Sequence, residues 1–130
     1  MKKIKIILFL VALGLTLTFG LNIGISGVQA PGTAGIKIIY PNGGEVLNAG
    51  ASVRVKWTSD NSKGMVILVL YKKGIKHSVI SNGAPDNGLF LWKILPALPE
   101  GNDYRIRIRL KDNLSINDFS DRNFTVKKKG

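Results

Sequence analysis

The feature of this sequence that most constrains its fold is a strict alternation of apolar and basic residues over Tyr104–Leu110. Successive side chains of a β-strand point to opposite faces of a sheet, so this period of two predicts a strand with one buried face. The apolar set is Tyr104, Ile106, Ile108 and Leu110, and the basic set is Arg105, Arg107 and Arg109. The apolar face therefore needs a second layer of structure to cover it.

Other short segments after Gly35 carry strand signals of the same kind. Met65–Tyr71 is apolar on both faces, which predicts a central strand, and Asn82–Gly88 is rich in turn residues. Further loops are predicted at Pro96–Asp103 and Lys111–Asp118. The predicted strands are Ile36–Tyr40, Ser52–Thr58, Met65–Tyr71, Ile75–Ile80, Leu89–Ile94, Tyr104–Leu110 and Phe119–Val126, with a short piece at Glu45–Leu47.

These signals predict an all-β domain over residues 36–126, with no helical stripe after Gly35. About seven short strands within roughly 100 residues are typical of a two-sheet antiparallel β-sandwich. We expect Val66, Leu68 and Leu70 to face outward. The expected core is Val53, Val55, Trp57, Ile67, Val69, Trp92, Tyr104, Ile106, Ile108, Phe124 and Val126.

The first thirty residues have the pattern of an export signal. Met1–Lys5 is basic, Ile6–Leu21 is uncharged and mostly apolar, and small and polar residues lead to Ala30. This order predicts a secretory signal peptide over residues 1–30, cleaved after Ala30, and a linker over residues 31–35. An uncleaved anchor helix is the alternative, because the uncharged run that begins at Ile6 is long enough to span ~30 Å of hydrocarbon.

Both alternatives place the domain outside the cytoplasm, either secreted or at the extracytoplasmic cell surface. Contact with a membrane is then expected only through an uncleaved N-terminal segment. Nucleic acid is not an expected partner, because an exported chain seldom meets it and no aromatic residues alternate with the arginines. Residues 127–130 are expected to form a solvated basic tail.

The composition excludes several classes of site. The chain has no Cys and a single His, which rules out disulfides, cysteine nucleophiles and multi-histidine metal sites. Asp60, Asp112 and Asp118 lie in loops that could share one end of a sandwich, but calcium needs about six to eight oxygen ligands. We interpret them as turn-forming residues and His77 as an ordinary strand residue, and we expect no metal, no cofactor and no enzymatic activity.

The candidate binding site is the arginine row, which we define as Arg105, Arg107 and Arg109. The chain has 19 Lys and Arg against 8 Asp and Glu, and the row would lie on one face of one strand. Its aliphatic stems could cover apolar residues of the neighbouring strand and keep the guanidinium groups in water. Alternatively, the guanidinium groups could bind a cell-envelope polymer or a surface protein through carboxylates or phosphates. Both interpretations stay open.

Several segments in a particular order carry a family resemblance. Leu98–Ile106 resembles the tyrosine corner of fibronectin type III and immunoglobulin-like domains, in which a Tyr hydroxyl bonds to the backbone of the preceding loop. The other matching segments are Tyr40–Glu45, Ala49–Gly50, Val55–Ser59, Gly88–Trp92, Gly101–Tyr104 and Asp118–Val126. Together they resemble the domain of the Ser/Thr-rich GPI-anchored membrane protein family, related to yeast cell-wall synthesis proteins of the Kre/Knh type.

The resemblance implies an immunoglobulin/fibronectin-III-like fold and a cell-surface location, but no particular reaction. The expected function is that of a non-enzymatic module that binds or organises cell-envelope polymer or protein partners. The alternative is a subunit of a surface filament or membrane-anchored complex, docked by edge-strand addition, and an enzyme acting on wall glycans is a third hypothesis. Asn113 and Asn123 each begin a sequence that fits the N-glycosylation acceptor pattern.

Overall fold

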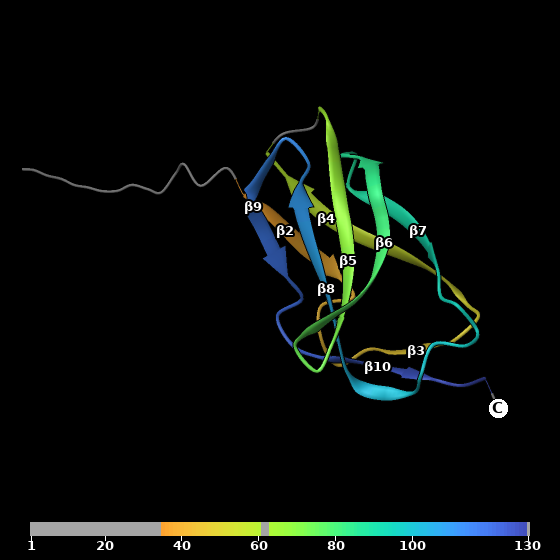
Figure 1. The fold of residues 1–130 in the computed structure, drawn as a ribbon. Coiled ribbons are helices and arrows are strands. Elements are labelled where there is room, and N and C mark those ends of the chain that lie inside the picture. Colours follow the sequence, from red (N-terminus) through yellow and green to blue (C-terminus); the bar gives the residue numbers. More distant parts are fainter. Residues whose placement is uncertain (1–34, 61–62, 130) are drawn as a thin grey trace, which may run out of the picture. The chain divides into compact units, whose positions relative to one another are not determined.

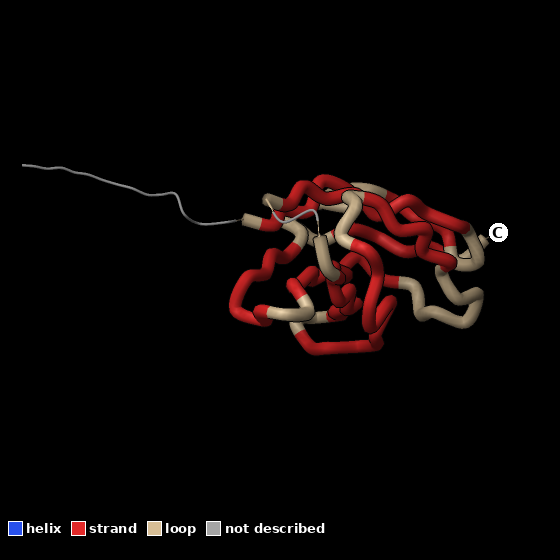
Figure 2. Tube along the Cα trace, turned by 90° about the horizontal axis from the view of Figure 1, so that it is seen from above, coloured by secondary structure: helices blue, strands red, loops and turns tan. Residues whose placement is uncertain are grey.

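The computed structural model of the chain describes residues 35–60 and 63–129, which consist of strands and loops (Figure 2). Residues 1–34 contain the predicted signal or anchor helix and most of the predicted linker, and they lie outside the described residues. In the described part of the chain, no helix has the length and apolar character needed to cross a membrane. The all-β prediction is confirmed for the domain that follows.

The larger of two sheets has six strands (Figure 1). Five follow the order β3-β10-β8-β5-β6, and β9 pairs with the second half of β8, whereas β10 pairs with the first half. The predicted central strand, β5, indeed lies between β8 and β6. β3 and β10 run parallel while the other pairs are antiparallel, so the sheet is mixed rather than fully antiparallel. Its strands are β3 (Val46–Asn48), β5 (Met65–Lys72), β6 (Ile75–Pro85), β8 (Gly101–Leu110), β9 (Asn113–Phe119) and β10 (Phe124–Lys127).

The smaller sheet has three antiparallel strands in the order β2-β4-β7. They are β2 (Ile36–Tyr40), β4 (Ser52–Ser59) and β7 (Leu89–Lys93). This sheet forms the second layer of the sandwich and lies behind the larger sheet in Figure 1, with β2 next to β9. The backbone amide of Ile38 donates to Asp118 Oδ2 at 2.9 Å and so ties β2 to β9.

Two segments predicted as loops belong to strands. β9 takes up most of Lys111–Asp118, because β10 pairs with the first half of β8 only and β9 pairs with the second half. β6 continues through Asn82 to Pro85, and an edge strand tolerates a proline because one side of its ladder is unpaired. Both segments were predicted as loops from their polar and turn-forming residues, but each pairs with the strand before it: β9 forms a hairpin with β8, and the end of β6 pairs with the start of β5.

The outer and inner faces of β5 are the reverse of the predicted ones. Val66, Leu68 and Leu70 are almost completely buried in the core between the sheets. Ile67 and Val69 lie on the outer side of the sheet, beside the arginine row, where Val69 is nevertheless buried at 7% exposed. Paired residues of adjacent strands share a face, so the inward isoleucines of β8 bring the even-numbered residues of β5 inward. Because β5 is apolar on both faces, its own sequence could not indicate this orientation.

Most of the remaining predicted core is confirmed. Val53 is only partly buried and packs against the edge of the core. The predicted residues that the structure places in the core are Val55, Trp57, Trp92, Tyr104, Ile106, Ile108, Phe124 and Val126.

A buried carboxylate joins the two sheets. Asp86 follows β6 and is only 3% exposed. Its Oδ1 accepts a hydrogen bond from Trp57 Nε1 at 2.8 Å, and its Oδ2 accepts one from the Ser59 hydroxyl at 2.6 Å. Because Trp57 and Ser59 belong to β4, these two bonds hold the smaller sheet against the end of β6.

Tyr104 forms the predicted tyrosine corner. Its hydroxyl donates to the Pro99 carbonyl oxygen at 2.6 Å, while its ring is fully buried and stacks on Phe124 with 6.1 Å between the ring centroids. Burial raises the pKa of the Tyr104 phenol above its ordinary value of 10.0, and the nearby Lys72 offsets part of this effect. The corner therefore anchors the loop before β8 to the core.

We predict that Asp86→Ala lowers the free energy of unfolding by about 2–3 kcal/mol, because it leaves the buried Trp57 Nε1 donor without its acceptor and removes the bond from the Ser59 hydroxyl. Urea unfolding followed by tryptophan fluorescence measures the change. Asp112→Ala is the matched control: its carboxylate is exposed and makes no hydrogen bond to a described residue, so a change of less than about 0.5 kcal/mol is expected. Equal effects of the two substitutions would contradict the structural role of Asp86.

We predict that Tyr104→Phe lowers the free energy of unfolding by about 1–2 kcal/mol at neutral pH, through loss of the bond to Pro99. The unfolded chain releases the phenol proton at a lower pH than the folded domain does, so the contribution of Tyr104 is complete below about pH 10 and declines above it. The deficit of the variant should therefore shrink on going from about pH 8 to about pH 10.5 in urea titrations. A deficit that stays constant between these pH values would contradict the assignment, and the exposed Tyr40→Phe is the control for general effects of a lost hydroxyl.

Candidate functional site

The arginine row lies on the outer face of β8, where the alternation of the sequence predicts it. Its side chains cover the outer side of β5, so the predicted cover over Val66, Leu68 and Leu70 is wrong, because those three residues are in the core. Across the strand pair, Arg109 lies opposite Ile67, Arg107 opposite Val69 and Arg105 opposite Tyr71. The structure thus brings the three arginines together on one half-buried strip.

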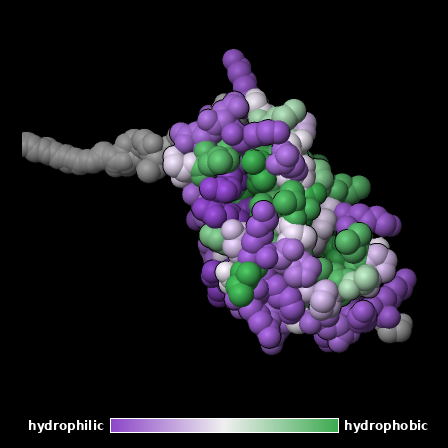
Figure 3. All heavy atoms as spheres, viewed as in Figure 1, coloured by the Kyte–Doolittle hydropathy of each residue, from purple (hydrophilic) through white to green (hydrophobic). Residues whose placement is uncertain are grey.

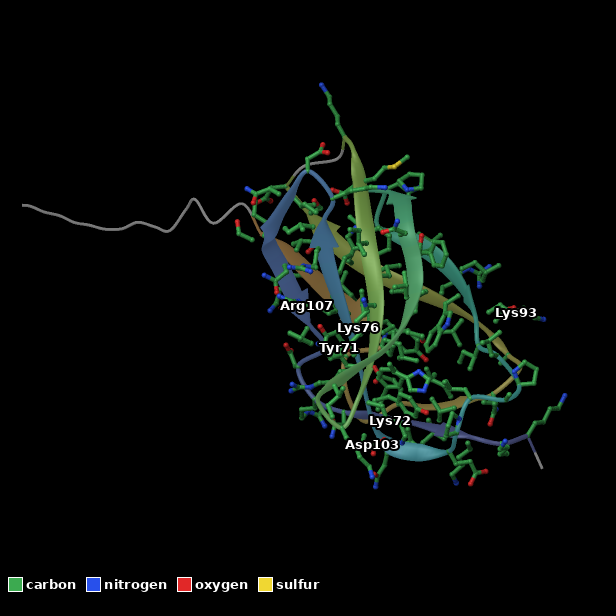
Figure 4. The ribbon with its side chains drawn as sticks, in the orientation of Figure 1. Tyr71, Lys72, Lys76, Lys93, Asp103 and Arg107 are labelled. Atoms are coloured by element: carbon green, nitrogen blue, oxygen red, sulfur yellow. The ribbon has the colours of Figure 1, made fainter. Side chains whose placement is uncertain are left out.

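Arg107 is held from several sides. Its Nη1 donates to the Tyr71 hydroxyl at 3.3 Å, and its Nε donates to Asn117 Oδ1 at 3.2 Å. The guanidinium also lies 5.0 Å from the centre of the Phe119 ring, which meets the Tyr71 ring edge-on. Figure 4 shows Arg107 and Tyr71 near each other on the β8–β5 side of the domain. The side chain is therefore fixed by contacts from β5 and β9.

The other two arginines are held by backbone carbonyl groups. Arg105 Nη2 donates to the Asp121 carbonyl oxygen at 2.8 Å, and Arg109 Nε donates to the Leu114 carbonyl oxygen at 3.4 Å. Each of the three guanidinium groups keeps at least one terminal nitrogen that makes no hydrogen bond to a described residue. The row is therefore ordered by the fold and still has donors to offer to a ligand.

A second basic surface lies on the outer face of the smaller sheet, and the sequence analysis did not select it. We call it the basic sheet face. Its cations are Lys37, Arg54, Lys56 and Lys93, and its exposed aliphatic residues are Ile39, Leu89 and Leu91. Alternation over Ser52–Thr58 already put Arg54 and Lys56 on one side of a strand. The strand order β2-β4-β7 was needed to add the residues of β2 and β7 to them.

The basic sheet face contains no compensating charge of its own. None of the residues of β2, β4 and β7 is Asp or Glu. In the described part of the chain, its four cations make no hydrogen bond or salt bridge. The face is hollowed beside β2, where Ile39, Tyr40, Arg54 and Lys56 line an open depression of about 470 Å³. The surface can therefore accept an anionic partner without first losing internal contacts.

Two of the acidic loop residues accept hydrogen bonds from backbone amides. Asp60 Oδ2 accepts a hydrogen bond from the Gly35 amide at 2.9 Å, and Asp118 binds the Ile38 amide. Within residues 35–60 and 63–129, no three His, Asp or Glu side chains lie close enough together to hold a metal ion. His77 is exposed on the edge strand β6, which is the location predicted for it. These residues are accounted for by turn and strand positions.

The first and last segments of the family resemblance bind each other. Asn42 Oδ1 accepts from the Asp121 amide at 2.8 Å, and Asn42 Nδ2 donates to Asp121 Oδ2 at 2.9 Å. The Glu45 carboxylate accepts hydrogen bonds from the amides of Asn42 and Gly43 at 2.8 and 2.7 Å. A Cβ at Gly43 would lie 2.6 Å from Arg122 Cβ, so a glycine is required there. These contacts therefore tie the segment before β3 to the segment before β10.

Both asparagines of the glycosylation pattern are exposed. Asn113 begins β9, and its Oδ1 accepts hydrogen bonds from the Ser115 amide at 3.3 Å and the Ser115 hydroxyl at 2.6 Å. Asn123 precedes β10, whose Phe124 is buried.

Comparison with known proteins was made at the level of structures, curated sequences and families. Structures of Clostridium thermocellum CbhA fibronectin(III)-like modules are similar, with a TM-score of 0.39 and 17% sequence identity, over 72% of this chain and 93% of that chain. No curated protein matches the sequence. Residues 40–126 match the family described as the Kre9/KNH-like N-terminal Ig-like domain. That match covers most of the chain and nearly all of the described sandwich, so the chain belongs to the family of Kre9/KNH-like Ig-like domains.

Proposed function

We propose that this protein is a non-catalytic, extracytoplasmic module of the cell envelope that binds an anionic envelope polymer through the arginine row. Membership of a Kre9/KNH-like family supports a role connected with the cell wall, and Ig-like domains typically lack catalysis. The signal-like pattern of the first thirty residues supports an extracytoplasmic location. The observation that carries the choice of site is the ordered arginine row, whose terminal nitrogens are still available.

The distribution of charge supports an anionic partner. Most of the acidic side chains of the domain bind uncharged groups, as Glu45, Asp60 and Asp118 do with backbone amides. Asp103 instead forms a salt bridge with Lys72 at 2.7 Å (Figure 4). The 8 Asp and Glu residues offset fewer than half of the 19 Lys and Arg residues, and only one ion pair brings opposite charges together in the described part of the chain. The positive field that remains attracts polyanions.

The geometry of the row suits repeated anionic groups. Three guanidinium groups at every second residue of one strand are spaced by about 7 Å, and Arg binds carboxylates and phosphates with paired donors. The bonds to Tyr71, Asn117 and Asp121 hold the side chains in place before binding, which reduces the entropy lost when a ligand is engaged. Hydrophilic residues predominate on the face that contains β5, β6 and β8, with hydrophobic residues in separate patches (Figure 3).

We predict that the triple charge reversal Arg105→Glu, Arg107→Glu and Arg109→Glu lowers retention of the domain on isolated envelope material by about tenfold or more at low salt, and by less at high salt. Co-sedimentation at several salt concentrations measures the change. Lys127→Glu, Lys128→Glu and Lys129→Glu is the matched control, because it changes the net charge equally at the exposed C-terminal end. The melting temperature of each variant shows whether it is folded, and unchanged retention of a folded arginine variant would overturn the choice of site.

A second candidate function is assembly with other protein subunits by edge-strand addition. It is favoured by an apolar hollow of about 360 Å³ between the edge strands β6 and β7, lined by residues that include Val79, Ile80, Phe90 and Leu91. An added strand could pair with an edge and place side chains in this hollow. Val79→Lys should then abolish oligomers seen by light scattering at high protein concentration. A wild-type domain that stays monomeric with candidate partners would remove this alternative.

A further inference from the structure

The basic sheet face combines two chemical characters on one surface. Its strands interleave cations with exposed aliphatic residues, and no carboxylate lies between them. In the register of the sheet, Lys56 pairs with Leu89 on β7 and with Tyr40 on β2, and Arg54 pairs with Leu91. Each of these cations therefore has an apolar neighbour across the ladder.

Three aliphatic residues of this face are exposed to solvent. Leu91 is 59% exposed, Ile39 52% and Leu89 45%. The outer face of β8 differs, because its arginines bind to neighbouring strands and cover the apolar side of β5. On the basic sheet face, in the described part of the chain, the four cations make no such bonds. The cations and the aliphatic side chains of this face are thus both available for contact with a partner outside the domain.

The presence of both cations and exposed aliphatic residues distinguishes between two kinds of anionic partner, a soluble polyanion and a lipid bilayer. A soluble polyanion is bound by cations alone, and exposed leucines add nothing to its affinity. The surface of an anionic bilayer attracts basic side chains and also takes up aliphatic side chains at the boundary between headgroups and acyl chains. Exposed aliphatic residues between unpaired cations therefore fit the bilayer better than the polymer.

We propose that the basic sheet face docks the domain on the surface of an anionic lipid bilayer. This contact goes beyond the proposed function and uses the opposite layer of the sandwich, so the arginine row on β8 remains free for an envelope polymer. The interacting groups are Lys37, Arg54, Lys56 and Lys93 with lipid phosphates, and Ile39, Leu89 and Leu91 with the outermost acyl carbons. Each basic side chain close to an anionic surface strengthens binding by about fivefold, so four of them are enough for a measurable affinity.

The experiment uses residues 31–130, because the core lies entirely between Ile36 and Val126 and the apolar N-terminal segment would bind lipid by itself. The probe is a vesicle in which about one lipid in three is phosphatidylglycerol and the rest phosphatidylcholine. Co-sedimentation should show binding to these vesicles at low salt and not to pure phosphatidylcholine. Absence of binding to the anionic vesicles would overturn the proposal.

Two variants distinguish binding to a bilayer from binding to a soluble polyanion. Replacing Lys37, Arg54, Lys56 and Lys93 by Gln should weaken vesicle binding by about 100-fold or more. Ile39→Ser with Leu89→Ser should weaken it by about tenfold and leave binding to dextran sulfate, a soluble polyanion, unchanged. If the aliphatic pair binds vesicles as the wild type does, the face is a polyanion site and the membrane proposal fails.

Matched controls keep this proposal distinct from the function proposed for the arginine row. Ile75→Ser with Val79→Ser removes two exposed aliphatic residues from β6, outside the basic sheet face, and should change vesicle binding by less than about twofold. Replacing the arginine row by Gln should reduce retention on envelope material and leave vesicle binding within about twofold. Loss of vesicle binding in the arginine variant would place the lipid contact on the larger sheet and overturn the inference.

Discussion

The structure depends on the burial of one face of β8 against the smaller sheet. Tyr104, Ile106 and Ile108 are fully buried on that face, and the same strand pairs with β5 on one side and with β10 and β9 on the other. Because paired residues share a face, the inward side of β8 determines which residues of its neighbours enter the core. The tyrosine corner at Pro99 and the pairing of Asn42 with Asp121 then secure the ends of this arrangement.

The same constraint produces the two outer surfaces. With alternate residues of β8 committed to the core, the arginine row must lie outside, where β5 and β9 provide acceptors and an aromatic ring for Arg107. The smaller sheet repeats the pattern, since burial of Val55 and Trp57 turns Arg54 and Lys56 to the outside. The sandwich therefore presents basic residues on both layers. On the larger sheet, the arginines form hydrogen bonds to neighbouring segments. On the smaller sheet, the basic side chains make no such bonds within the described part of the chain. We therefore assign the two layers different partners.

Much of the fold could be predicted from local pattern. The strands around Trp57, Trp92 and Tyr104 alternate clearly, and the corner motif predicts the tyrosine whose hydroxyl binds the Pro99 carbonyl oxygen. The predictions differ from the structure where the local pattern does not decide between alternatives. The polar character of β9 predicts a loop, and β5 is apolar on both faces, so that neither face is marked as the inner one. In each case, pairing with β8 decides the outcome. Of the two candidate surfaces, the arginine row could be predicted from the sequence of one strand. The basic sheet face combines residues of three strands, so it could be recognised only once the order of those strands was known.

The amino-acid sequence alone thus established an all-β domain, the outward position of the arginine row and the absence of cysteine chemistry, because each depends on residue type or on spacing within one segment. Tertiary structure decided the rest. It turned Val66, Leu68 and Leu70 into the core, gave Asp86 its position between the sheets, and gathered Lys37, Arg54 and Lys93 on one face. The physical reason is that the alternation of side chains follows from the local sequence, whereas the neighbours of a strand are decided by hydrogen bonds between different segments of the chain.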